Sequence, residues 1–506
     1  MNDISDFVPP TIEWYVLVPF IVLLAGALSL LLVGSLTPRW PRGWYAILTA
    51  LAAGTAGVLA ALQFAALADE EPRSIARGVI AHDRFGLLAV VAICVAVVLS
   101  CMIASESAPN ALEPYALMLT AAIGASVMVT SNDLVVTFLG IEILSISMYV
   151  LVASDRRRLS SQEAGLKYFV LGGFSSAFLL YGIALVYGTT GQTSINGIGN
   201  VLADEVTVPR NDAMLLAGVA LLLVGLAFKV SLVPFHSWTP DVYQGAPTYV
   251  TGFMASLGKV AAIVALVRLF VVAFPARADD WRPAVFVLAV ATLTVGSVLA
   301  IVQSDVKRML AYSSVSHAGF MLVGLEAAGH LSSVPAGEGT SAALVYVVLY
   351  SVLAVGSFAA VSVVTRGTSA SGGESEAGLG SSLDSFKGVA KTNPAFALGF
   401  TVLLLAQAGV PLTSGFVAKF GVIRAATSSG SYVLAILAMV SAVVAAYLYL
   451  RVMVNMWLVE PSPSRPLVLG LSAKLVMLTT VTITIVLGVV PGVIFRLDGL
   501  GQLISG

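Results

Sequence analysis

The chain has 506 residues, of which 58% are hydrophobic and 10% are charged, and its formal net charge is −1. Soluble domains carry about 25% charged residues, so this composition excludes an ordinary soluble fold and predicts an all-α polytopic membrane protein. The balanced charge excludes a basic surface for nucleic acid. Two cysteines and four histidines, without a Cys-x-x-Cys pair, offer no framework for an iron–sulfur cluster, a haem or a zinc ion.

A helix needs about 20 apolar residues to cross the hydrocarbon core of a membrane. The seventh apolar segment meets Pro234, and the twelfth is interrupted by Pro411 and Gly415, so we expect both helices to be broken. About fourteen transmembrane helices are predicted in one integral membrane domain, over residues 14–35, 45–66, 86–103, 112–130, 133–153, 163–187, 213–235, 249–273, 284–303, 309–329, 342–365, 394–424, 431–457 and 471–495.

Each broken segment also carries a lysine, Lys229 before the first break and Lys419 after the second. Paired interrupted helices in corresponding parts of a chain indicate a transporter built from inverted repeats. We therefore expect a first half over residues 111–273 and a second half over residues 284–457.

Lysine and arginine concentrate in one alternate set of loops, which the positive-inside rule places in the cytoplasm. With fourteen crossings, both termini then lie outside the cytoplasm. The set includes a Gly- and Ser-rich stretch, residues 366–392, which predicts a flexible cytoplasmic loop. The basic residues of the set are Arg39, Arg42, Arg156, Arg157, Arg158, Lys307, Arg308, Arg366, Lys387 and Lys391.

Four charged residues lie inside predicted spans: Glu142, Lys229, Lys259 and Lys419. A charge at the bilayer centre costs roughly 2.5–3.5 kcal/mol, so such side chains usually face the bundle interior or a water path, where they bind or relay ions. Lysine suits a proton relay because, unlike arginine, it can release its proton. The alternative is structural, with Glu142 and a lysine pairing to hold two helices together.

Two further residues belong to the same hypothesis. His317 lies in the middle of the tenth segment, and histidine changes charge near neutral pH, although a lone membrane histidine is also a common packing residue. Lys167 lies near the start of the sixth segment, where the alternative is a lysine that reaches out to the membrane surface.

The segment after the first break is predicted to lie at the cytoplasmic mouth. His236 and Asp241 in this segment could help protons to enter. Trp238 and Tyr243 beside them are expected to be interfacial anchors.

The motifs around these residues resemble the antiporter-like membrane subunits of respiratory complex I. VSLVPFHSWTPDVYQGAPT follows Lys229, and KYFVLGGFSSAFLLYG and VKRMLAYSSVSHAGF have similar counterparts. The PDVYxGAPT form resembles the N type of subunit rather than the L and M types, which tend to read PDAHxxAPT. There are two departures. Gln244 stands where the family often has Glu, and PLTSGF stands where it often has PPLAGF.

The resemblance implies fourteen helices, with two inverted five-helix repeats and broken helices 7 and 12. It also implies that Glu142 and Lys229 are a coupled pair, that Lys259 is the central relay and that Lys419 lies on the outward path. Lys167 matches a lysine implicated in the first half, and His317 matches a histidine often found in the connecting segment.

The resemblance further implies a proton-translocating NADH:quinone oxidoreductase in the cell (plasma) membrane. This chain would hold no cofactor, because NADH, FMN, the iron–sulfur clusters and quinone would bind to partner subunits. Its neighbours would be the antiporter-like subunit M, small subunits such as K and J, and lipid. The alternatives are a subunit of a multi-subunit Na⁺/H⁺ antiporter, a solitary secondary transporter for an organic solute, and a structural scaffold.

Overall fold

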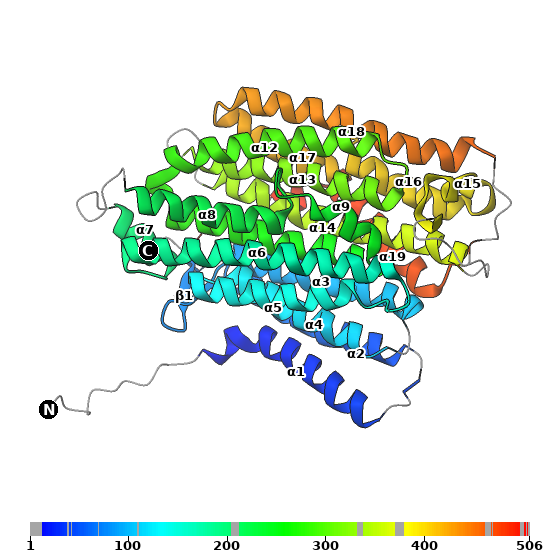
Figure 1. The fold of residues 1–506 in the computed structure, drawn as a ribbon, viewed down its shortest axis with the longest axis horizontal. Coiled ribbons are helices and arrows are strands. Elements are labelled where there is room, and N and C mark those ends of the chain that lie inside the picture. Colours follow the sequence, from blue (N-terminus) through cyan, green and yellow to red (C-terminus); the bar gives the residue numbers. More distant parts are fainter. Residues whose placement is uncertain are drawn as a thin grey trace.

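The protein is a long bundle of helices in this computed structural model (Figure 1). The structure describes residues 13–495 apart from 38–39, 42, 69, 109–110, 204–211, 331–336, 370–378, 461–466 and 468, together with residues 500, 501 and 503. The expected positions of Arg39, Arg42 and the extreme termini therefore lie outside the described residues.

Three helices and a short hairpin precede the first expected half. Helices α1 (Trp14–Leu36) and α2 (Trp44–Ala66) lead to the strands β1 (Arg73–Ile75) and β2 (Ile80–His82), and α3 (Arg84–Ser107) follows. The strands pair antiparallel, with Arg73 opposite His82.

The first set of five crossings follows α3. It consists of α4 (Glu113–Thr130), α5 (Leu134–Val152), α6 (Leu159–Thr190), the broken pair α8 (Ala213–Val230) and α9 (Trp238–Gly245), and a last crossing in four pieces. These pieces are α10 (Thr248–Phe253), the π-helical η2 (Met254–Gly258), α11 (Lys259–Arg268) and the π-helical η3 (Leu269–Ala273). The short helix α7 (Ile195–Ala203) packs against η3.

The second set of five follows the turn η4 (Pro275–Arg277). It consists of α12 (Ala278–Ile301), α13 (Val306–Ala328), α14 (Glu338–Ser369), the broken pair α16 (Pro394–Ala408) and α17 (Ser414–Ser428), and α18 (Tyr432–Leu458). Helix α19 (Leu471–Val489) and the short α20 (Gly492–Phe495) complete the described helices.

The number of crossings agrees with the prediction. In the described part of the chain, twelve helices are long and apolar enough to cross a membrane. Helix α13 and the broken pair α16–α17 pack among these twelve, which gives fourteen crossings. Helix α13 is less apolar because it carries Lys307, Arg308 and Glu326 near its ends.

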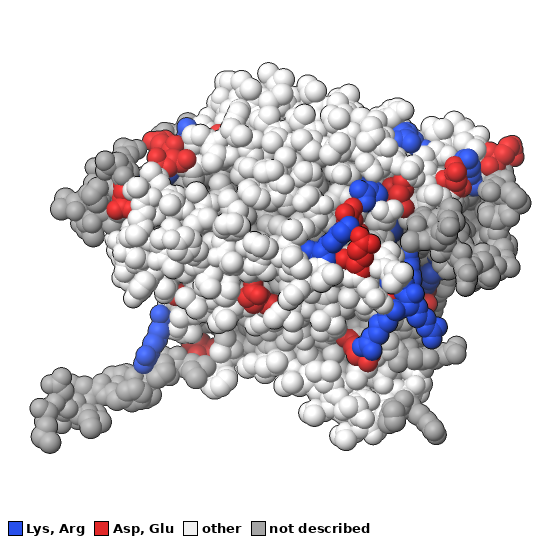
Figure 2. Space-filling view, in the orientation of Figure 1, with Lys and Arg blue, Asp and Glu red and all other residues white. Residues whose placement is uncertain are grey.

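The two ends of the bundle differ. We call the end that carries the α5–α6 connection and α9 the basic end, and the end that carries the β1–β2 strands and α7 the hairpin end (Figure 1). Figure 2 shows most of the visible lysine and arginine gathered toward the basic end, with a largely uncharged belt across the middle. Helix α4 begins at the basic end and α12 begins at the hairpin end, so the two sets of five helices run in opposite senses.

Both predicted helix breaks are confirmed. Ser231 caps the end of α8 with a left-handed φ of 69°, and Pro234 follows, which cannot supply a helical N–H. Gly409 caps the end of α16 with a φ of 90°. Thr413 caps the start of the next helix, and its side chain accepts a hydrogen bond from the N–H of Phe416.

The flexible loop over 366–392 stays a prediction, and its described part includes short helical segments. Helix α14 continues to Ser369, and the later residues form η5 (Leu379–Ser381), η6 (Leu383–Phe386) and α15 (Val389–Thr392). Gly and Ser in this stretch do not prevent order, because the Ser381 hydroxyl donates to Asp305 and the Gly388 N–H donates to the Asn455 carbonyl. Residues 370–378 lie outside the described residues.

Candidate functional site

Lys229 occupies the last turn of α8, directly before the first break. Its ammonium donates to the Ser145 hydroxyl at 2.7 Å and to the Tyr149 hydroxyl at 3.4 Å, both on α5. Lys229 also lies 5.7 Å from the centre of the Tyr149 ring. The ammonium is thus held by neutral groups that can both accept and donate hydrogen bonds.

Glu142 is close to Lys229 without pairing with it directly. It lies three residues before Ser145 on α5, so both side chains share one face of that helix. Its carboxylate accepts a short hydrogen bond from Ser176 on α6. Among the described residues no ion pair joins Glu142 to Lys229. The two expected partners are separated by about one turn of α5, the turn from Glu142 to Ser145.

Lys259 binds the broken end of α8. Its ammonium donates to the Val230 carbonyl at 2.8 Å, and the residue is buried. The last carbonyls of a helix have no intrahelical partner, and a cation there gains about 0.3–1 kcal/mol from the helix dipole, or up to about 2 kcal/mol when partly buried. The π-helical turn η2 ends immediately before Lys259, and such turns are frequent at functional sites.

A small internal cavity of about 20 Å³ lies between Lys229 and Lys259. Lys229, Ser145, Ser231, Lys259 and Gly258 all line it. A buried water needs about 10–15 Å³ and at least two polar partners, and this cavity meets both conditions. Lys229 and Lys259 therefore face one site large enough for a water molecule.

Lys419 also binds carbonyls at the end of a broken helix, but it belongs to the helix that follows the break. Its ammonium donates to the carbonyls of Gln407 and Ala408, both at 2.9 Å, at the end of α16. It also lies 4.9 Å from the centre of the Phe320 ring. Lys419 belongs to α17, after its break, whereas Lys229 belongs to α8, before its break, so the two lysines are not positional equivalents.

His317 lies at the centre of a buried hydrogen-bond network between α13, α14 and α18. Its Nδ1 bonds with the Tyr346 hydroxyl at 2.8 Å, and its Nε2 with the Tyr449 hydroxyl at 3.2 Å. The Tyr449 hydroxyl also bonds with Ser313 at 2.5 Å, and Ser313 donates to the Gln407 side chain at 3.3 Å. Since Lys419 donates to the Gln407 backbone, these residues connect His317 to the second break.

The two groups lie on neighbouring helices at similar depth. Helix α11 contacts α8 and α13, and α13 contacts α17. Among the described residues no hydrogen bond joins Lys259 to the His317 network. The predicted line therefore consists of two groups, with a gap between them. Hydrogen bonds link His317 to Lys419 in one group. In the other group Glu142, Lys229 and Lys259 lie near one another, with no hydrogen bond between them among the described residues.

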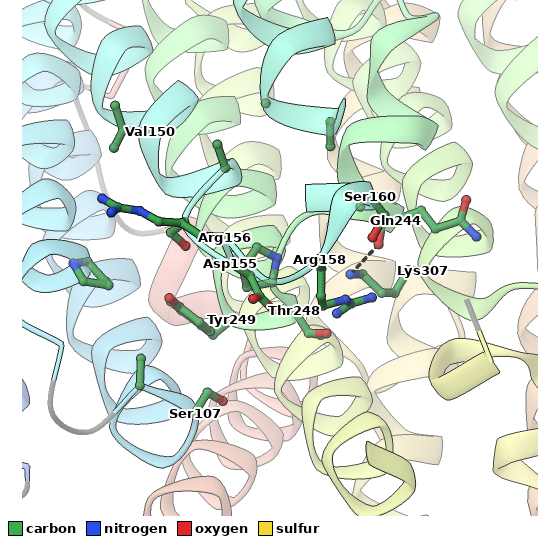
Figure 3. Close-up of a pocket in the computed structure, with 18 of the residues that line it drawn as sticks. Ser107, Val150, Asp155, Arg156, Arg158, Ser160, Gln244, Thr248, Tyr249 and Lys307 are labelled. Atoms are coloured by element: carbon green, nitrogen blue, oxygen red, sulfur yellow. Dashed lines mark hydrogen bonds between the residues drawn. The ribbon is translucent and has the colours of Figure 1, made fainter. Parts of the chain in front are cut away.

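A large cavity of about 1540 Å³ opens at the basic end. We call this cavity the vestibule. Figure 3 shows it between the α5–α6 connection and the start of α10, with Arg156, Arg158 and Lys307 among its lining residues. Lys307 is buried and donates to the carbonyls of Gln244 and Ala246 at the end of α9.

The structure brings Asp241, which was expected at the mouth, together with Lys167, which was expected near the start of the sixth segment. Asp241 and Lys167 line the vestibule and pair with each other at 3.1 Å. Lys167 also pairs with Glu163, and Asp241 pairs with Arg308 at 2.7 Å. Lys167 thus belongs to the vestibule and makes no described contact with Lys229.

The other mouth residues differ from expectation. His236 does not line the vestibule; its ring lies near Tyr312, and its buried Nδ1 has no hydrogen-bond partner within the described part of the chain. Trp238 and Tyr243 are buried rather than interfacial, so that expectation is wrong. The Trp238 indole N–H donates to the Phe228 carbonyl, because α9 folds back over the open end of α8.

Sequence reasoning missed several buried polar residues. Arg268 and Asp83 form a buried ion pair at 2.6 and 2.8 Å near the hairpin end. Glu326 accepts hydrogen bonds from Ser431 at the hairpin end of α13. The polar residues Tyr449, Gln407 and Tyr149 also escaped notice, because uncharged residues in apolar segments give no signal of a partner on another helix.

Comparison with known proteins finds relatives of this chain among membrane subunits. The family model described as NADH:quinone oxidoreductase/Mrp antiporter, TM, matches residues 131–445. NADH-quinone oxidoreductase subunit N from Mycobacterium tuberculosis is 48% identical over 382 residues, which are 75% of this chain and 69% of that protein.

Two solved structures resemble the fold. A chain of respiratory complex I from Thermus thermophilus has a TM-score of 0.79 at 28% identity, over 95% of this chain and 99% of that chain. A chain of the Mrp complex from Dietzia sp. DQ12-45-1b has a TM-score of 0.84 at 21% identity, over 97% of each chain. The second likeness shows the shared fold alone.

Proposed function

Since the chain belongs to the NADH:quinone oxidoreductase/Mrp antiporter family of membrane subunits, we propose that it is the N-type proton-translocating subunit of an NADH:quinone oxidoreductase. The observation that carries the proposal is the placement of Lys229 and Lys259 around one cavity at a helix break. Both ammonium groups can release a proton, and a single water in the cavity would connect them.

The proton would move in stages along the two polar groups. Lys229 takes a proton from the basic end, and the negative charge of Glu142 favours its charged state by Coulomb attraction. Transfer to Lys259 places a charge beside the end of α8, where the Val230 carbonyl accepts a hydrogen bond from the Lys259 ammonium. The His317 network and Lys419 would then carry a proton toward the hairpin end, once the gap between the groups closes or fills with water.

The redox chemistry would take place elsewhere in the complex. We assign NADH, FMN, the iron–sulfur clusters and quinone to partner subunits, since the relatives are named as an NADH-quinone oxidoreductase subunit and as respiratory complex I. In this assignment the chain moves protons, and a conformational or electrostatic change that reaches it through the membrane arm drives the movement.

We further propose a plasma-membrane location with the basic end in the cytoplasm, on the support of the positive charge gathered there. Both termini would then lie outside the cytoplasm, although their last residues are not among those described. The subunits that we expect beside this chain are the antiporter-like M subunit and small subunits such as K and J.

Two other functions fit parts of the same geometry. An Mrp-type Na⁺/H⁺ antiporter subunit shares the fold, but the PDVYQGAPT motif resembles the N type. A structural scaffold would use the buried charges as ion pairs, yet Lys229, Lys259 and Lys419 all contact neutral hydroxyls or carbonyls in the described structure.

The test of the proposal is Lys229→Arg in the intact complex. Arginine keeps a positive charge but does not release a proton, so we expect assembly to persist while NADH-driven proton pumping is lost. Pumping and quinone reduction are measured in inside-out membrane vesicles and normalised to the assembled complex on a native gel. Lys391→Arg is the matched control, because Lys391 forms an exposed pair with Glu460. Normal pumping by an assembled Lys229→Arg complex would refute the proposal.

A further inference from the structure

One described side chain borders the vestibule and also contacts Lys229. Tyr149 lines the vestibule, and its hydroxyl lies 3.4 Å from the Lys229 ammonium. The other hydrogen-bond partner of Lys229, Ser145, faces the small internal cavity and does not line the vestibule. Tyr149 is therefore the described partner of Lys229 that also borders the open cavity.

The position of the Tyr149 hydroxyl depends on two features of α6. The ring packs edge-on against Tyr168 and Phe169, with centroid distances of 4.8 and 5.7 Å. A Cβ atom at Gly172 would lie only 2.0 Å from the Tyr149 hydroxyl oxygen. Glycine at 172 therefore leaves the space that this hydroxyl fills, whereas a Cβ at the adjacent Gly173 would meet nothing within 4 Å.

We propose that Tyr149 is the proton-entry residue that links the vestibule to Lys229. This inference rests on the proposed proton-translocating function. When Lys229 is neutral, the Tyr149 hydroxyl gives its proton to the Lys229 nitrogen and takes one from a hydronium ion in the vestibule, which is left as neutral water. One O–H bond breaks as another forms on the same oxygen, so tyrosine ends neutral and Lys229 ends charged.

The tyrosine is suited to this task by its chemistry. A hydroxyl both donates and accepts hydrogen bonds, so it can transmit a proton. Asp241 and Lys167, which line the same vestibule, would supply charged groups on the approach. The sequence suggested that His236 and Asp241 help protons to enter; entry through Tyr149 keeps Asp241 on the approach and leaves out His236.

The experiment compares Tyr149→Phe with wild type in the assembled complex. Phenylalanine keeps the ring packing and removes the hydroxyl, so we expect coupled quinone reduction and pumping to fall roughly tenfold or more. Imidazole added at the basic face of the vesicles should restore part of the turnover, because a small diffusible acid can replace a missing relay. A hydroxyl that merely packs against Lys229 predicts no such rescue.

Two glycine variants test the geometry independently. Gly172→Ala should displace the Tyr149 hydroxyl and reduce pumping as Tyr149→Phe does. In the double variant, Gly172→Ala should cause little further loss of pumping beyond that of Tyr149→Phe. Gly173→Ala and Tyr181→Phe are the matched controls on α6, since position 173 has open space and Tyr181 is exposed. Both controls should pump as wild type does.

The outcomes separate the two proposals. Wild-type turnover in assembled Tyr149→Phe, with Lys229→Arg inactive, would overturn the entry role and leave the function standing. Loss without imidazole rescue would also overturn it, in favour of a packing role. Normal pumping in both variants would refute the proposed function itself.

Discussion

Lys259 and Lys419 each donate to backbone carbonyls that a broken helix leaves without an intrahelical partner. This arrangement gives a buried ammonium strong acceptors without a fixed negative charge. A fixed carboxylate at hydrogen-bond distance would hold the proton tightly, whereas neutral carbonyls and hydroxyls let the residue exist in both protonation states. At the scale of single residues, the broken helices supply the neutral acceptors that let these buried lysines gain and lose a proton.

The His317 network offers a test at the same scale. Tyr449→Phe removes the hydroxyl that bonds with both His317 and Ser313, and it leaves the ring in place. We expect the complex to assemble and its pumping to fall several-fold, because hydrogen-bond continuity toward Gln407 is lost; the stability cost should be about 1–3 kcal/mol. NADH-driven acidification of inside-out vesicles measures the effect. Tyr432→Phe, at the exposed start of the same helix, should change nothing, and equal losses in both variants would argue against a role for the network.

The breaks themselves rely on backbone conformations that most residues avoid. Ser231, Gly409 and Leu412 all have positive φ angles, at 69°, 90° and 67°. Such conformations cost non-glycine residues roughly 1–2 kcal/mol, and they persist only where the surroundings hold them. Trp238 and Lys259 supply that support at the first break by binding the freed carbonyls of α8.

Gly409→Ala tests whether the second helix break depends on a left-handed φ at this position. The left-handed φ strains alanine, and its Cβ would lie 2.8 Å from the Lys419 side chain, so we expect a loss of about 1 kcal/mol or more together with reduced pumping. The heat stability of the purified complex and its pumping are the readouts. Gly421→Ala on the neighbouring α17 has open space and a helical φ, so it should be neutral or stabilising by about 0.5–1 kcal/mol. Equal behaviour of the two variants would show that the break tolerates a side chain.

The sequence predicts the breaks well and their partners poorly. Pro234 and Pro411 exclude a continuous helix locally, so their effect is visible in the chain itself. The Lys259–Val230 contact and the Tyr149–Gly172 fit depend on how distant helices pack, which periodicity does not reveal. Trp238 was wrongly expected at the membrane interface because tryptophan in general prefers that position. Here α9 folds back onto α8, and this packing buries Trp238.

The whole molecule combines two sets of helices that run in opposite senses with one vestibule at the basic end. The polar groups of the two sets meet near mid-depth but are not joined by a hydrogen bond within the described residues. A protein that moved protons freely through this line would dissipate the membrane potential. The gap between Lys259 and His317 therefore suits a device that conducts only when another part of a larger assembly drives it.

This view predicts the behaviour of the chain without its partners. Reconstituted alone into liposomes, it should show no proton or sodium flux when a pH gradient or a membrane potential is applied. The intact complex in matched liposomes should pump when NADH and quinone are supplied. A pH-sensitive dye inside the liposomes reports both measurements. Sodium-dependent proton flux by the isolated chain would instead favour the antiporter or solitary-transporter alternatives.

The buried pair of Arg268 and Asp83 has a consequence for biosynthesis. The two residues are 185 positions apart, and at about 5–20 residues per second the ribosome needs roughly 10–40 seconds to travel that distance. We expect Asp83 to lack its arginine partner during that interval, while the five crossings after α3 are made. In the finished fold its side chain accepts a hydrogen bond from the Gly86 N–H at the start of α3, and α11 contacts α3. The Arg268–Asp83 pair can therefore form only after α11 has been inserted.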